Sequence, residues 1–226
     1  MKIVIGTTAA GHKHKSVLNW LEDAEQLQQI TPHDICYFLA AEMHPTGYDS
    51  RLNEVSARVR ALGGTVWRFM IDDESDVITN ATRMVRICEG RNLITEYAIR
   101  ERADWILFID SDIVVPSDVI NKLLEIGKPF CGFNVPSYCL SGEAVHGFNF
   151  PVQIYQNTAG AWFLHHSVFR YFRWLWDPAD GLTDDPATYR LIRDKLGFVQ
   201  HNRLDVCGEH EPLVRFEDRD EDLSVY

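Results

Sequence analysis

The chain has few cysteines, no long apolar run and no pair of cysteines at C-x-x-C spacing. Its 226 residues include five scattered cysteines, so neither a disulfide framework nor a structural zinc site is expected, and the thiols suit a reducing compartment. No stretch approaches the roughly 20 apolar residues of a membrane span, and the apolar run after Lys2 is too short for a signal peptide. These features predict a cytoplasmic protein without membrane contact.

Basic residues are also scarce: 22 Lys and Arg stand against 33 Asp and Glu, which gives a net charge of -11. This balance opposes general binding to nucleic acid or to an anionic membrane, because both depend on cations that neutralise phosphates, although a local basic groove stays open. The hydrophobic content of 46% allows a substantial core. The length fits one large domain better than two, and no internal repeat or linker divides the chain.

Short apolar runs that suit strands alternate with segments of helical periodicity. The expected strands are 2–6, 35–41, 65–70, 104–110 and 129–135. The expected helices are 16–30, 50–62, about 80–102 with a possible break at Gly90, and 116–126. Farther along, we expect antiparallel pairing or loops over 137–158, helices near 166–176 and 186–196, and short strands within 198–207. This alternation predicts an α/β fold with a mostly parallel sheet flanked by helices.

Two aspartates follow the apolar strand 104–110 in the stretch FIDSDIVV (108–115). Ligands of open parallel sheets gather beyond the carboxyl ends of the strands, so Asp110 and Asp112 stand where a site is expected. Two close carboxylates repel unless a cation compensates, and a hard divalent ion that also takes phosphate oxygens is the natural partner. The alternative is that both residues only end the strand and cap the next helix. An EF-hand is excluded, because Val114 and Val115 occupy positions that need an oxygen ligand and a glycine.

The stretch from residue 89 to 125 joins an Arg-Asn pair, a helix and a hydrophobic strand that ends in D-x-D. It resembles the core of nucleotide-sugar-dependent glycosyltransferases of the GT-A fold, particularly family-two-like enzymes. Three further segments resemble this family in the same order: the glycine-containing acceptor-side segment, the x-E-D helix, and the strand with a C-terminal histidine, which match 157–169, 183–198 and 204–210. The resemblance spans about residues 1–210.

The resemblance implies one GT-A (Rossmann-like) glycosyltransferase domain over residues 1–226. Its nucleotide-binding half would be about 1–115, and its acceptor-side half, with a smaller antiparallel portion, about 116–210. An acidic tail, 211–226, would follow; its charge run over 217–222 is most simply a solvated face.

The resemblance also implies a metal site. Asp112 would bind Mn²⁺ or Mg²⁺ directly, Asp110 would contact the ribose or bind the metal through water, and His210 would be a further metal ligand. The ion would bridge the diphosphate of a nucleoside-diphosphate sugar. The alternative is an ordinary loop residue, which a lone histidine beside a glycine more often is.

By the same resemblance Asp185 matches the catalytic aspartate, which in inverting enzymes takes the proton of the attacking acceptor hydroxyl. Asp185 precedes Pro186 and is also a good helix N-cap, a role that is compatible with catalysis. Asp184 stands where the family usually has Glu, so the base could be either aspartate.

Five further residues match positions near the donor sugar nucleotide, and an aromatic residue could also contact a sugar. Thr7, Thr8 and Glu42 match contacts to the nucleotide base and ribose, although each also suits turn chemistry. Arg91 and Asn92 match the Arg-Asn pair beside the nucleotide, although both could be solvated or salt-bridged. Trp162 could lie along a sugar or acceptor; core packing is the stronger expectation in so apolar a stretch, and 169–176 likewise suits an amphipathic core helix.

Together these features predict a metal-dependent, hexosyltransferase-like enzyme that makes a single, inverting transfer to a hydroxyl of a glycan, protein or modified nucleobase. Gln200 and Arg203 have the spacing of the Q-x-x-R-W segment of processive synthases, but Leu204 replaces the tryptophan. One alternative is a haloacid-dehalogenase-like phosphotransferase, whose D-x-D normally follows an early strand, whereas about half the chain precedes it here. Another is a catalytically silent nucleotide-binding module.

Overall fold

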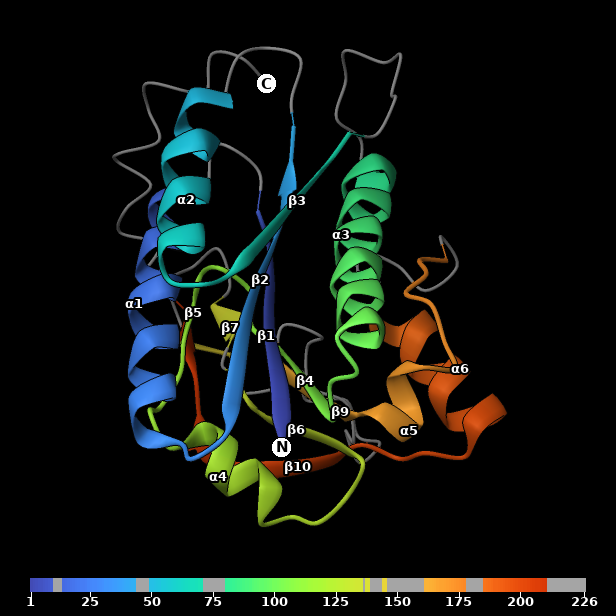
Figure 1. Ribbon diagram of the computed structural model, residues 1–226. Coiled ribbons are helices and arrows are strands. Elements are labelled where there is room, and N and C mark those ends of the chain that lie inside the picture. Colours follow the sequence, from blue (N-terminus) through green and yellow to red (C-terminus); the bar gives the residue numbers. More distant parts are fainter. Residues whose placement is uncertain are drawn as a thin grey trace.

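A seven-stranded sheet forms the middle layer of the protein, with helices on both sides (Figure 1). The computed structural model describes residues 1–9, 14–43, 49–70, 80–135, 137–138, 144–145, 161–177 and 185–210. The strand order is β10-β6-β9-β4-β1-β2-β3. The strands of this sheet are β1 (Lys2–Ala9), β2 (Asp34–Glu42), β3 (Thr65–Phe69), β4 (Trp105–Phe108), β6 (Phe130–Asn134), β9 (Trp162–His165) and β10 (His201–Cys207).

The sheet is mostly parallel, as the alternation of strands and helices predicted. β1 pairs in parallel with β2 and β4, β2 with β3, and β6 with β10, whereas β9 runs antiparallel between β4 and β6. Two small antiparallel pairs add to it: β5 (Ile113–Val114) with β11 (Glu209–His210), and β7 (Ser137–Tyr138) with β8 (Ala144–Val145). The expected smaller antiparallel portion is therefore confirmed.

Helices cover the two faces of the sheet and enclose separate cores. The helices are α1 (His14–Ile30), α2 (Asp49–Ala61), α3 (Asn80–Arg100), α4 (Val119–Leu124), α5 (His166–Phe169) and α6 (Asp185–Leu196). Because successive side chains of a strand point to opposite faces, Ile3 and Ile5 of β1 join the core under α1 and α2, while Val4 joins the core under α3, α5 and α6. Within the described ranges, no helix combines the length and the apolar character that crossing a membrane requires.

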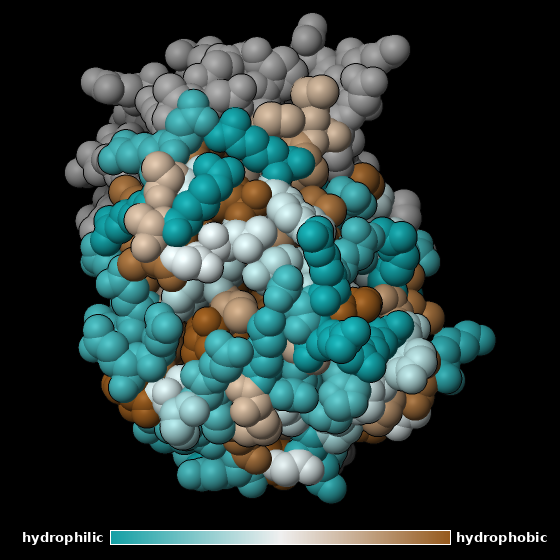
Figure 2. Space-filling model, in the orientation of Figure 1, coloured by the Kyte–Doolittle hydropathy of each residue, from teal (hydrophilic) through white to brown (hydrophobic). Residues whose placement is uncertain are grey.

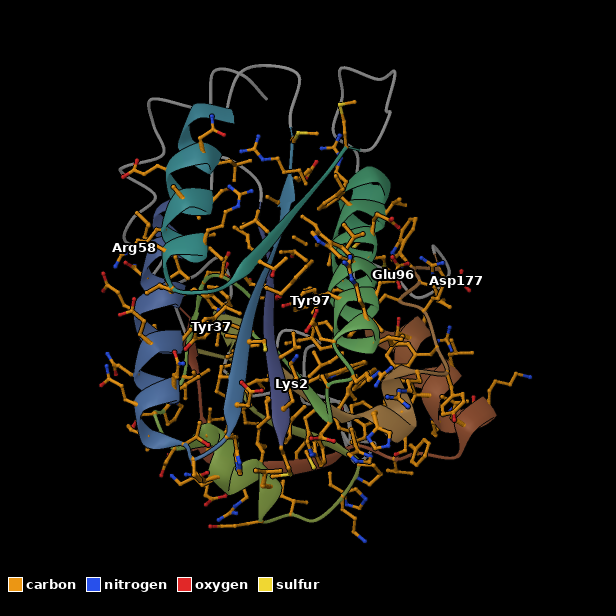
Figure 3. All side chains as sticks on the ribbon, viewed as in Figure 1. Lys2, Tyr37, Arg58, Glu96, Tyr97 and Asp177 are labelled. Carbon is orange, nitrogen blue, oxygen red and sulfur yellow. The ribbon has the colours of Figure 1, made fainter. Side chains whose placement is uncertain are left out.

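Two tyrosines illustrate the two faces (Figure 3). The Tyr37 hydroxyl donates to the Ala24 carbonyl of α1 (2.8 Å), and burial raises the pKa of this phenol. On the other face, the ring of Tyr97 from α3 stacks on Phe38 at 4.5 Å between centroids. Each face is therefore closed by a helix docked onto the central strands.

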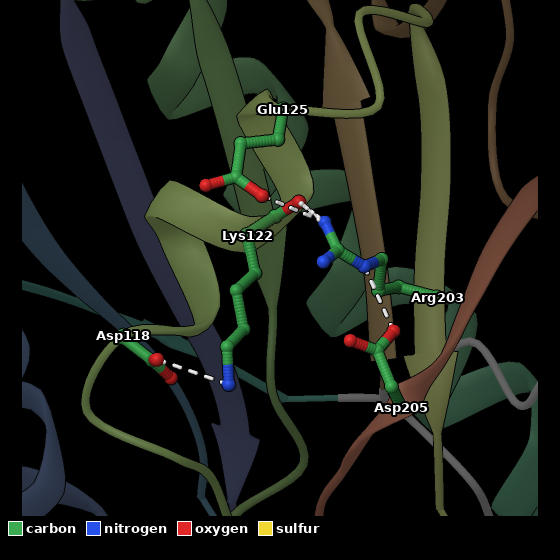
Figure 4. Close-up of polar contacts among 5 residues, drawn as sticks. All are labelled: Asp118, Lys122, Glu125, Arg203 and Asp205. Carbon is green, nitrogen blue, oxygen red and sulfur yellow. Dashed lines mark hydrogen bonds and ion pairs between the residues drawn. The ribbon is translucent and has the colours of Figure 1, made fainter.

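The outer surface is largely hydrophilic on the side seen in Figure 2, with apolar residues scattered over it. At the β10 edge, Arg203 donates to the Glu125 carboxylate (2.9 Å), to the Lys122 carbonyl (3.0 Å) and to Asp205 (2.8 Å), as Figure 4 shows. These bonds attach α4 to β10. Because the carboxylates are mostly exposed, each ion pair contributes little stability on its own.

Most predicted elements are confirmed, and two helices differ. The helix expected from Pro116 begins at Val119, because the chain turns first at Ser117 and Asp118. The helix expected over 166–176 ends at Phe169. Residues 172–177 lie outside helices and strands, because buried side chains of α3 and α6 bond their backbone instead.

The possible break at Gly90 is absent, and α3 continues through it. A Cβ atom at Gly90 would lie 2.5 Å from Cγ2 and 3.1 Å from Cβ of Thr8 on β1. Glycine therefore lets α3 approach the end of β1 closely, and this packing outweighs the cost of about 1 kcal/mol that glycine brings to a helix.

We expect Gly90→Ala to lower the free energy of unfolding by about 1 kcal/mol, because overpacking by about 1–3 kcal/mol exceeds the gain in helix propensity. Denaturant titration of both proteins measures the difference. Thr8→Ser removes the nearest methyl group, so Gly90→Ala should cost less in that background. An equal cost in both backgrounds, or a gain in the wild type, would contradict this packing argument.

Candidate functional site

The carboxyl ends of β1, β4 and β2 lie next to one another and carry the predicted polar residues. Phe108 at the end of β4 is level with Gly6 of β1, and the Ile109 N–H donates to the Gly6 carbonyl (3.2 Å). Asp110 therefore follows β4 at about the level of Thr8. Thr8 in turn is level with Ala40, two residues before Glu42. The sheet thus gathers residues from three separate segments at one edge.

The D-x-D stretch forms a turn rather than a continued strand. The Asp110 carbonyl accepts from the Ile113 N–H (3.0 Å), and residues 111–112 form the turn before β5. Asp110 and Asp112 are both partly exposed, whereas Ser111 between them is buried. The Ser111 hydroxyl has no hydrogen-bond partner among the described residues. Both carboxylates therefore keep access to solvent at the end of a buried strand.

Arg91 holds the first of these aspartates. Its guanidinium Nη2 donates to Asp110 Oδ1 at 3.1 Å and lies 3.4 Å from Oδ2. The arginine side chain is only 5% exposed, while that of Asp110 is 36% exposed. On its other side, the guanidinium lies 4.9 Å from the centroid of the Trp174 ring. Arg91, predicted beside the nucleotide, is thus fixed between the carboxylate and an aromatic face.

A second arginine of α3 pairs with the carboxylate at the end of β2. Arg86 Nε lies 3.1 Å from Glu42 Oε1, and both side chains are 14% exposed. Burial raises the pKa of the Glu42 carboxyl above its ordinary value, and the charge of Arg86 opposes this shift. The sequence analysis identified Glu42 but missed Arg86, because the pair depends on how α3 packs against β2 and no local pattern indicates it.

The two threonines at the end of β1 differ in exposure. Thr7 is 1% exposed, and its hydroxyl has no hydrogen-bond partner among the described residues. Thr8 is partly exposed and packs over Gly90. Their proposed contacts to a nucleotide remain predictions.

The backbone of His210 lies beside the D-x-D turn. β11 pairs antiparallel with β5 so that His210 is opposite Ile113, the residue after Asp112. Gly208 makes this approach possible, because a Cβ there would lie 2.9 Å from the Phe133 ring and 3.2 Å from the Val114 carbonyl oxygen. The side chain of His210 lies outside the described part of the structure. Its role as a metal ligand stays a prediction.

Two predicted donor-site residues are buried and engaged elsewhere. The Asn92 amide accepts from the Trp174 N–H (2.8 Å) and donates to the Trp174 carbonyl (3.2 Å). Trp162 is fully buried, with its ring 4.9 Å from those of Phe130 and Trp174. Its surroundings fit the core packing that the sequence also allowed, rather than a surface for a sugar.

The helix that carries the predicted base begins one residue before its expected start, so Asp185 is its first residue rather than its N-cap. α6 starts at Asp185, while Asp184 and the side chain of Asp185 lie outside the described residues. Three residues into α6, the buried Thr188 hydroxyl bonds both the N–H (3.2 Å) and the carbonyl (3.1 Å) of Leu175. Sequence analysis missed Thr188 and Trp174, although the alternation of Phe172, Trp174 and Trp176 is typical of an extended segment.

The D-x-D turn offers two carboxylates that could bind a divalent ion. Among the described side chains, no group of three or more His, Cys, Asp or Glu could hold a metal ion. Asp110 and Asp112 are one residue apart, partly exposed and beside the His210 backbone. This donor set fits Mg²⁺ or Mn²⁺ bound by one or two carboxylates that complete their coordination with water and phosphate oxygens.

Comparison with solved structures identifies the fold. S. aureus TarS, residues 1–349, superposes with a TM-score of 0.58 at 10% identity, over 93% of this chain and 60% of that one. The mannosyltransferase PcManGT from Pyrobaculum calidifontis, in complex with GDP-Man and Mn²⁺, gives a TM-score of 0.56 at 12% identity, over 92% of this chain and 56% of that one. The chain has the GT-A fold.

The GT-A fold is thus present at sequence identities too low to transfer an activity. TarS 1–349 in complex with UDP gives a TM-score of 0.59 at 11% identity, over 92% of this chain and 60% of that one. This chain therefore spans between about half and three fifths of the length of these neighbours. No protein-family model matches the chain, and no curated protein matches it either.

Proposed function

We propose that the protein is a metal-dependent glycosyltransferase that moves a sugar from a nucleoside-diphosphate sugar to an acceptor hydroxyl in a single, inverting transfer. The observation that carries this proposal is the D-x-D turn at the end of β4 of a GT-A fold, where the buried Arg91 forms an ion pair with Asp110. Structural neighbours with this fold were solved with GDP-Man and Mn²⁺ and with UDP. The proposal rests on the match of fold and site together.

Each group at the sheet edge would have a role in binding the donor. Asp112, Asp110 and His210 would hold Mn²⁺ or Mg²⁺, and a bound ion would supply neutralisation of the charge that develops on the leaving diphosphate. Thr7, Thr8 and Glu42 would orient the base and ribose. Arg91 would orient the Asp110 carboxylate through the hydrogen bond from its guanidinium.

The acceptor side would supply the base. Asp185, or Asp184 beside it, would take the proton of the acceptor hydroxyl while the hydroxyl oxygen bonds to the anomeric carbon and the bond to the diphosphate breaks. No covalent sugar-enzyme bond is needed for such an inverting transfer. The net charge of -11 favours a glycan or protein hydroxyl over a nucleobase in a polyanion as acceptor.

The haloacid-dehalogenase-like alternative would use Asp110 as a nucleophile. The Arg91 contact and the GT-A fold favour a ligand-orienting role for this carboxylate over attack on a phosphate. The catalytically silent binding module has the same fold, and only turnover separates it from an enzyme.

A thermal-shift screen of nucleoside diphosphates with and without Mn²⁺ tests the donor site. One nucleotide should raise Tm by about 5–10 °C at about 100 times its Kd, and only with the metal present. Asp112→Asn should remove the metal-dependent part. Asp118→Asn changes an exposed carboxylate that pairs with Lys122 and should keep it. If no nucleotide gives a metal-dependent shift, the proposed function is wrong.

A further inference from the structure

Residues 172–177, here called the linking segment, run from the end of α5 towards α6 without forming a helix or strand. Phe172 and Trp174 are buried, while Arg173 and Leu175 are exposed, so the side chains alternate as in an extended chain. Because the segment belongs to no ladder, its buried backbone groups need other hydrogen-bond partners.

Two buried side chains from different helices supply those partners. Asn92 of α3 bonds both the N–H and the carbonyl of Trp174, and Thr188 of α6 bonds both backbone groups of Leu175. Asn92 is 7% exposed and Thr188 is fully buried. An amide and a hydroxyl can each donate and accept at once, so each side chain satisfies a complete backbone unit. The linking segment is thereby tied to α3 and α6 at adjacent residues.

The same contacts continue to the D-x-D turn. The Trp174 ring packs against the Arg91 guanidinium, which bonds Asp110. Trp174 also packs edge-on against Phe108 at the end of β4, with 4.9 Å between centroids. An unbroken series of contacts therefore connects Asp110 to Thr188, one turn after Asp185.

We propose that Asn92 and Thr188 are positioning residues, which act through the linking segment to fix the first turn of α6 relative to the D-x-D turn. The inference rests on the proposed function, in which the first turn carries the base and the D-x-D turn holds the donor diphosphate. The two groups come from opposite ends of a long stretch of chain, so no local structure sets their separation. A displacement of about 1 Å between reacting groups can lower a rate by about 100-fold. The hydrogen bonds of Asn92 and Thr188 to the linking segment should therefore affect kcat.

Thr188→Val tests whether the hydrogen bonds between Thr188 and Leu175 fix the first turn of α6, and Thr188→Ser is its matched control. Valine has nearly the shape of threonine but lacks the hydroxyl, so kcat should fall roughly 10- to 100-fold while donor KM stays within about twofold. Serine keeps the hydroxyl and should restore kcat. Ile192→Val removes a buried methyl group from the far half of the same helix and controls for loss of stability. An unchanged kcat in Thr188→Val, or an equal fall in Ile192→Val, would overturn the proposal.

Hydrogen exchange separates this inference from the proposed function. In Thr188→Val, the amides of 187–190 should exchange faster than in the wild type and in Thr188→Ser, while those of β1 should be unchanged. Faster exchange without a change in kcat would assign Thr188 only a structural role. Unchanged exchange would show that the Thr188–Leu175 hydrogen bonds do not stabilise the first turn of α6. A wild type that makes no transfer would refute the proposed function and the kinetic role with it, while exchange would still decide whether the tie exists.

Asn92→Ala asks whether Asn92 positions the linking segment or contacts the nucleotide. Positioning predicts a lower kcat and a nucleoside-diphosphate Kd within about twofold of the wild type, as measured by calorimetry. A Kd weakened by about tenfold or more with kcat at saturation unchanged would assign Asn92 to the nucleotide instead and overturn its positioning role.

Discussion

Asp185→Asn is expected to lower turnover by about 10²- to 10⁴-fold, the usual contribution of a general base. Asp185 is the first residue of α6, and asparagine has nearly the same size and shape as aspartate, so α6 should keep its start and most of its stability. The Mn²⁺-dependent thermal shift with nucleoside diphosphate should also persist, because the donor site lies at the D-x-D turn. The measurement is sugar transfer or donor hydrolysis at saturating donor, together with the thermal shift of the same variant.

The neighbouring aspartate is the control for that variant. Asp184→Asn should leave turnover within a few-fold of the wild type if Asp185 is the base. The reverse pattern would assign the base to Asp184, which stands where related enzymes usually have Glu. Full turnover in both variants would contradict the mechanism, and no turnover in the wild type would favour the silent nucleotide-binding module.

Phe163→Ala should lower the free energy of unfolding by about 3–5 kcal/mol, a large part of the 5–15 kcal/mol of a typical domain. Phe163 is fully buried in β9, between β4 and β6, and its ring stacks on Trp105 at 4.3 Å and 9°. Truncation would leave a cavity in the centre of the sheet, where the neighbouring strands have little freedom to close it. The midpoint of denaturant unfolding measures the loss.

Tyr171→Ala is the matched aromatic control. Tyr171 is 67% exposed, so its removal should change the free energy of unfolding by less than about 0.5 kcal/mol. Phe163→Leu keeps most of the buried volume and provides a measurable midpoint if the alanine variant does not fold. Equal losses in Phe163→Ala and Tyr171→Ala would contradict the burial of β9 in the centre of the sheet.

The predicted elements with long, periodic patterns are confirmed, whereas the helix expected over 166–176 ends at Phe169. The run 16–30 lies as predicted because its helical period determines which face is buried. The strands around Ile5 and Ile106 lie as predicted because continuous apolar runs suit strands that are covered on both faces. The segment 169–176 carries Phe, Trp and Leu at spacings that suit a helix as well as a strand. Its backbone bonds to Asn92 and Thr188, residues 82 and 13 positions away from their partners, decided between the two.

The site residues also divide into those that the local sequence predicts and those whose contacts depend on packing. Asp110 and Asp112 were predictable from their place after an apolar strand, because that place is a property of local sequence. The pairs Arg91–Asp110 and Arg86–Glu42 were not predictable as pairs, because they depend on how α3 packs across β1, β2 and β4. Gly90 illustrates the difference: its sequence context suggests a helix break, whereas its contact with Thr8 keeps the helix intact.

The amino-acid sequence by itself determined the α/β class, the order of strands and helices in the first half, and the acidic turn at the end of β4, because hydrophobic period and turn residues act over short distances. Only the tertiary structure decided that β9 inserts antiparallel between β4 and β6, that His210 pairs opposite Ile113, and that Asn92 and Thr188 bond the linking segment. These contacts join residues far apart in the chain. Their partners are selected by packing and by the need to satisfy buried polar groups.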